Sequence, residues 1–106
     1  MSSKKKTKFY FTEYANHMIR FYLSTPNGLK LQDKTGASIA NWMAVQRVLY
    51  KLPEADMAMV KQIYTAQKAV PASVDQYCQE TGADPEAVWA FIVKLNYKVA
   101  KARGLV

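Results

Sequence analysis

A glycine turn followed directly by a helix-start signal lies near the carboxyl end of the chain and constrains the fold more than any other local pattern. Gly82 is expected to end a helix, because glycine adopts the left-handed backbone conformation without steric cost. Asp84 is then expected to cap a new helix, with Pro85 at its first position and Glu86 complementing its positive end. The pattern therefore predicts two helices joined by a very short turn.

The two predicted helices span Ser73–Thr81 and Pro85–Arg103, and Ser73 is expected to cap the first of them. Apolar residues recur at helical spacing through the second helix as far as Gly104, namely Val88, Phe91, Ile92, Leu95, Val99 and Ala102. Helices joined by so short a turn are expected to cross steeply, as in a helix-turn-helix. In that arrangement the second helix can enter the major groove of DNA.

The chain is basic, with 15 Lys and Arg residues against 8 Asp and Glu residues and a formal net charge of +7. This balance favours a polyanionic partner, without separating DNA, RNA and an acidic membrane surface. Residues 1–8 include four of the lysines and are expected to form a disordered basic tail, or alternatively an arm that contacts phosphates.

Cys78 is the single cysteine among 106 residues, so an intrachain disulfide and a cysteine zinc cluster are both excluded. A lone thiol fits a reducing compartment. No apolar run approaches the roughly 20 residues that a membrane-spanning helix needs. We therefore expect a cytoplasmic protein with no membrane partner.

Three further helices are predicted in the first two thirds of the chain. The first spans Phe9–Ser24, with Thr12 as its cap. The second is capped by Ser38 and ended by Pro53. The third runs from Pro53 towards Gln67, and its first turn holds the acidic residues Glu54 and Asp56. Residues 29–36 are expected to form a loop. The sequence thus predicts an all-α fold: a compact bundle of about five helices, forming a single domain over residues 9–106 with the helix-turn-helix at 73–103.

The order of parts from Leu52 onward resembles region 4 of the sigma-70 family and its sigma-like regulatory relatives. The family's opening Leu-Pro-Glu and its apolar helix ending near a tyrosine are similar to Leu52-Pro53-Glu54 and Ile63-Tyr64. The family's acidic-apolar-glycine turn is similar to Glu80-Thr81-Gly82-Ala83, with Cys78 at the small-residue position. The resemblance covers about the last half of the chain and implies a DNA-binding transcriptional regulator.

The residues expected to contact DNA lie along the outward side of the last helix: Glu86, Trp89, Ala90, Val93, Lys94, Lys98, Lys101 and Arg103. The three lysines and the arginine are expected to contact phosphates, or alternatively to form a solvated helix end that complements the helix dipole. The others are poor for direct base readout, which relies mainly on Arg, Lys, Asn and Gln. Trp89 is expected either to pack against the first or second predicted helix or to be exposed in an interface.

Two functions follow as hypotheses. The first is a small DNA-binding transcriptional regulator that binds double-stranded DNA, with a homodimer as a further expectation because many helix-turn-helix proteins bind paired half-sites. The alternative is a protein–protein interaction module that binds RNA polymerase or another regulator, without sequence-specific DNA binding. No enzyme, metal site or cofactor is expected, because the sequence lacks a phosphate loop and a nucleophile–base pair, and His17 has no companion ligand.

Overall fold

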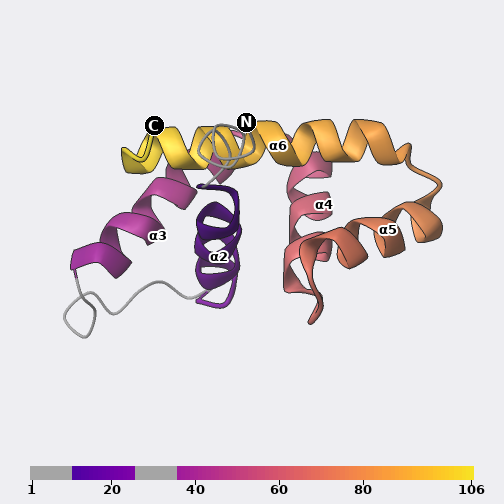
Figure 1. The fold of residues 1–106 in the computed structure, drawn as a ribbon, viewed down its shortest axis with the longest axis horizontal. Helices are drawn as coiled ribbons and strands as arrows, with labels where there is room; N and C mark the ends of the chain where they lie inside the picture. The colour runs from indigo at the N-terminus through magenta and orange to yellow at the C-terminus, as the bar shows by residue number, and fades with distance from the viewer. Residues whose placement is uncertain (1–10, 26–35) are drawn as a thin grey trace, which may run out of the picture.

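The computed structural model describes residues 11–25 and 36–106, which form five helices and no strand (Figure 1). The predicted all-α bundle is therefore confirmed. The predicted basic tail at 1–8 and nearly all of the predicted loop at 29–36 lie outside the described residues. The helices are α2 (Phe11–Leu23), α3 (Gly36–Leu49), α4 (Glu54–Thr65), α5 (Val70–Thr81) and α6 (Pro85–Arg103).

The longest helix, α6, lies across the ends of the others (Figure 1). Its carboxyl-terminal half packs against α2 and α3, and its amino-terminal half meets α5. α2 contacts α3, α4 and α6, so it lies at the centre of the bundle. α5 contacts α4 and α6 and diverges from α6 with distance from the turn that joins them.

The core forms because each helix places apolar side chains three or four residues apart and therefore on one face. On α2 the buried residues include Ala15, Met18 and Ile19, and on α6 they include Val88, Ile92 and Val99. They join one continuous cluster with buried residues of the other helices, among them Val45, Val60, Ile63, Val74 and Cys78. Within the described ranges, every helix falls short of the length or the apolar character that crossing a membrane requires.

A buried polar contact joins α4 to α2 and α6. The Tyr64 hydroxyl donates a hydrogen bond of 2.6 Å to Oδ1 of Asn16 on α2, and Oδ1 of Asn96 on α6 lies 3.5 Å from the same hydroxyl. Burial raises the pKa of the Tyr64 phenol above its ordinary value, and the positive charge of Arg20 opposes this in part. The folded state therefore favours the protonated form of the Tyr64 phenol.

The predicted end of the first helix of the last pair and both predicted ends of the second are confirmed. Gly82 ends α5 in the left-handed conformation with φ of 76°, and its N–H donates to the Cys78 carbonyl at 2.8 Å. The Asp84 side chain accepts a hydrogen bond of 3.3 Å from the backbone N–H of Glu86 at the start of α6. Gly104 ends α6 with φ of 86°.

Three predicted helix caps are wrong, because Thr12, Ser38 and Ser73 all lie inside helices. α5 begins at Val70, since the fixed φ of Pro71 suits its first turn. Ser73 is consequently a buried residue, with 3% of its surface exposed, and its hydroxyl faces the interior. Serine is a favoured cap residue, which is why Ser73 was predicted to cap the helix, but Ser73 lies on the buried face of α5.

The second predicted helix ends earlier than expected. α3 stops at Leu49, four residues before Pro53, because the chain tightens there: the N–H groups of Lys51 and Leu52 donate to carbonyls three residues back, at 3.3 and 3.0 Å. Pro53 directly precedes α4, and the two acidic residues predicted for its first turn lie there. α4 ends at Thr65, slightly before the predicted Gln67.

Candidate functional site

α6 has one buried face and one exposed face. The exposed side chains lie within one side of the helix, since they recur at intervals of three and four residues. We call this side the outer face of α6; its residues are Glu86, Ala87, Ala90, Val93, Lys94, Tyr97, Lys98 and Lys101. Six of the eight residues predicted to contact DNA lie on it.

The three predicted lysines lie together on the second half of the outer face. Lys94, Lys98 and Lys101 are all exposed, and none makes a hydrogen bond or ion pair with another described residue. Their spacing of four and then three residues places the three amines along one line of the helix surface. Their charges are therefore available to a partner.

Trp89 and Arg103 are not on the outer face. Trp89 is half-buried and packs against the hydrophobic core. Arg103 is also half-buried, and its Nε donates a hydrogen bond of 2.6 Å to Oδ1 of Asn41 on α3. Both side chains serve the packing of α6 onto the bundle.

The helix pair around Gly82 is acidic. Residues 70–93 contain four carboxylates and no lysine or arginine, and all four carboxylates belong to exposed residues: Asp75, Glu80, Asp84 and Glu86. Glu80 accepts hydrogen bonds of 2.9 Å from the amides of Gln62 and Gln76. Asp84 and Glu86 add negative charge at the start of α6, the end of a recognition helix that would approach bases.

A groove lies between the start of α2 and the second half of α6. We call it the α2–α6 groove; it has a volume of about 620 Å³ and is lined by Phe11, Thr12, Val93, Lys94, Tyr97, Lys98 and Val106. The rings of Phe11 and Tyr97 meet edge to face, with 6.3 Å between their centroids. Val93, Tyr97 and Val106 remain about half exposed, at 50%, 49% and 51%.

This exposed apolar surface was missed by the reading of the sequence. The signal was present, because Val93 and Tyr97 are four residues apart and hence on one helix face. Val93 was treated as a candidate DNA contact, and Tyr97 was not singled out. The contribution of Phe11 depends on a contact between helices that are far apart in the sequence, which spacing alone does not reveal.

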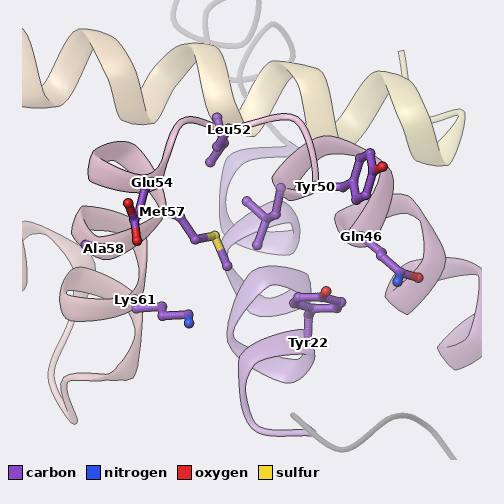
Figure 2. A pocket seen from close by; sticks show the side chains of 9 residues that line it. Tyr22, Gln46, Tyr50, Leu52, Glu54, Met57, Ala58 and Lys61 are labelled. Carbon is purple, nitrogen blue, oxygen red and sulfur yellow. The ribbon is translucent and has the colours of Figure 1, made fainter.

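A second hollow, of about 550 Å³, lies between α2, α3 and α4 (Figure 2). It contains none of the predicted site residues. Its two charged groups, Glu54 and Lys61, come from the same helix, with Met57 between them pointing towards α2 (Figure 2). The hollow is therefore separate from the surface predicted to contact DNA.

The described residues contain no group of three or more His, Cys, Asp and Glu side chains arranged to hold a metal ion. His17, the lone histidine, is exposed on α2. Comparison of the chain with protein-family models, with curated proteins and with solved structures finds no match.

Proposed function

We propose that the protein is a helical protein–protein interaction module that binds a partner protein through the outer face of α6. The observation that carries this proposal is the α2–α6 groove. There Val93 and Tyr97 of α6 lie half exposed beside Lys94 and Lys98, two lysines that have no partner among the described residues. Contiguous exposed apolar surface bordered by polar groups is typical of interaction sites. RNA polymerase or another regulator remains the expected kind of partner.

The distribution of charge favours a protein partner over a DNA partner. A helix start normally attracts phosphate, because its free N–H groups and dipole present positive charge. Here Asp84 and Glu86 place carboxylates at that position. Moreover, residues 1–10 and 26–35 contribute five of the seven net positive charges of the chain, so the helices themselves are close to neutral.

Site-specific photocrosslinking tests the proposal. Tyr97 is replaced by p-benzoylphenylalanine in the cells that naturally make the protein, and Tyr50, which is 85% exposed and lies outside the groove, receives the same replacement as a matched control. We expect a covalent adduct with another protein from position 97 and none from position 50. Absence of a protein adduct at 97, or equal adducts at both positions, would contradict the proposal.

DNA binding by a sigma-region-4-like regulator is the second candidate function, favoured by the line of Lys94, Lys98 and Lys101. Such lysines would contact phosphates without reading sequence. Anisotropy of a labelled random-sequence duplex at low salt measures this, with the triple variant K94Q/K98Q/K101Q as comparison. Duplex affinity that is lost in the triple variant and falls with salt, by a slope of about −0.9 per phosphate contacted, would support DNA binding. Absence of binding to the duplex at low salt would contradict the DNA-binding function.

A further inference from the structure

We propose that the α2–α6 groove binds an amphipathic helix of a partner protein that carries acidic residues beside its apolar face. This inference rests on the proposed function and names the chemistry of the partner. It follows from the shape of the groove, from the kind of side chains that line it, and from the sign of the charge at its edge.

The groove suits a helix because residues from the start of α2 and from α6 line it together, and the lining includes the apolar Phe11, Val93 and Val106. Phe11 comes from α2, while Val93 and Tyr97 come from successive turns of α6. Because Val93 and Tyr97 are four residues apart, they are aligned along the axis of α6, and apolar groups recurring at three or four residues on a partner helix match that alignment. The half-exposed Tyr97 ring offers a large apolar area that is already held in place by Phe11.

The charge at the groove selects an acidic partner. Lys94 and Lys98 line the groove, and none of the described residues that line it is acidic. Their amines have no partner among the described residues, so carboxylates of a bound helix can pair with them without displacing an existing contact. The aliphatic parts of the same lysines extend the apolar contact area.

Two other occupants fit the charge less well. A second copy of the chain docked symmetrically about the α2–α6 groove would bring Lys94 and Lys98 close to the same lysines of its partner. The segments of this chain that lie outside the described residues are themselves net positive, because residues 1–10 carry four lysines and residues 26–35 carry two lysines and one aspartate. The complementary negative charge therefore comes from a different protein.

Two labelled synthetic peptides test the inference against the full chain. Both are designed to be helical with leucines at i, i+3, i+4 and i+7; one has glutamates beside this face and the other has lysines at the same positions. Fluorescence anisotropy is expected to show that the glutamate peptide binds, with affinity that falls as salt rises, and that the lysine peptide does not. Equal binding of the two peptides, or binding of neither, would overturn the inference.

Variants of the chain locate the binding site. K94Q and K98Q are each expected to weaken the glutamate peptide about two- to fivefold, the range of a partly exposed ion pair. K51Q is the matched control, since Lys51 is exposed in the link after α3 and lies outside the groove. V93S is expected to weaken binding while the helical circular dichroism is unchanged, because Val93 is exposed. An equal loss in K51Q would overturn the assignment of the groove.

The failure of this inference is distinguishable from the failure of the proposed function. If position 97 crosslinks to a protein but the two peptides bind alike, the outer face is an interaction surface and the acidic helix is wrong. If the glutamate peptide binds but position 97 crosslinks to no protein in cells, the groove chemistry stands and the proposed function fails. Light scattering that shows a dimer disrupted by V93S would instead assign the groove to a second copy.

Discussion

Arg103 Nε donates a hydrogen bond of 2.6 Å to Asn41 Oδ1, joining the last turn of α6 to α3 across 62 sequence positions. The amide nitrogen of Asn41 donates in turn to the Tyr14 hydroxyl on α2 at 2.9 Å. One asparagine therefore connects three helices. The contact holds the end of α6 against the bundle, and so fixes the position of the lysines on its opposite side.

Replacing either partner of this contact is expected to lower stability. N41A and R103K should each reduce the free energy of unfolding by about 1–3 kcal/mol, because a hydrogen bond to a charged group is lost. R103K keeps the charge but lacks the planar guanidinium that Asn41 binds. Urea denaturation measures both variants and the double variant; the two effects should not add. R47K, at an exposed position of α3, is the control and should be neutral. Additive losses would contradict the contact.

Ser73 distinguishes the observed helix start from the predicted one. Its buried hydroxyl has no hydrogen-bond partner among the described residues, so S73A should leave the free energy of unfolding unchanged or raise it. A serine that capped the helix would instead contribute about 1 kcal/mol. Thermal and urea unfolding of S73A therefore give opposite signs for the two possibilities, and a clear loss of stability would contradict a start at Val70.

A comparison of alanine substitutions at Gly82 and Gly36 tests the turn between α5 and α6. G82A should destabilise the protein by about 1–2 kcal/mol, because alanine is strained at the φ of 76° found there. G36A at the start of α3 should be neutral or stabilising, since Gly36 has no positive φ. A Cβ atom would meet nothing within 4 Å at either site, so the difference between them isolates backbone conformation. Equal effects in urea denaturation would rule out the left-handed turn.

Tyr64 should make the folded state sensitive to alkali. Burial raises the pKa of its phenol in the folded protein, whereas the unfolded chain releases the proton near pH 10. The contribution of Tyr64 to stability is therefore fully present below about pH 10 and is lost as the pH rises further. Urea titrations at rising pH should show a steeper decline for the native protein than for Y64F.

Y50F is the control in this experiment, because Tyr50 is exposed. It should decline with pH as the native protein does. Y64F is also expected to be less stable at neutral pH, since Asn16 loses the hydroxyl that donates to it. If Y64F and the native protein lost stability in parallel above pH 10, the burial of the phenol would be contradicted.

Local signals in the sequence predicted those parts of the fold that depend on backbone conformation. Gly82 and Gly104 act through their own φ angles, and Asp84 acts through a hydrogen bond to a residue two positions away. Their roles could therefore be predicted from the local sequence. The predicted helix starts failed where a polar residue of capping type belonged to the helix interior, as at Ser73. There, burial in the interior of the bundle decided the outcome, and the spacing of residues along one segment does not predict that burial.

The candidate site divides in the same way. The exposure of Lys94, Lys98 and Lys101 follows from helical periodicity, and it was predicted. The packing of Trp89 was left open, and Arg103 was assigned to phosphate contact, although its guanidinium meets a residue of α3. Whether the helix pair acts as a DNA-binding helix-turn-helix stays a prediction, as does its relation to the sigma-70 family.

Because the chain has a single cysteine, the labelling of its thiol can measure local opening of the fold. Cys78 is buried where α5 meets the core, so a thiol reagent reaches its sulfur only while α5 has moved away from its neighbours. The rate of labelling therefore counts these local openings with no introduced probe. A partner that binds α6 alone would leave the labelling rate nearly unchanged. A partner that binds both α5 and α6 would lower the rate.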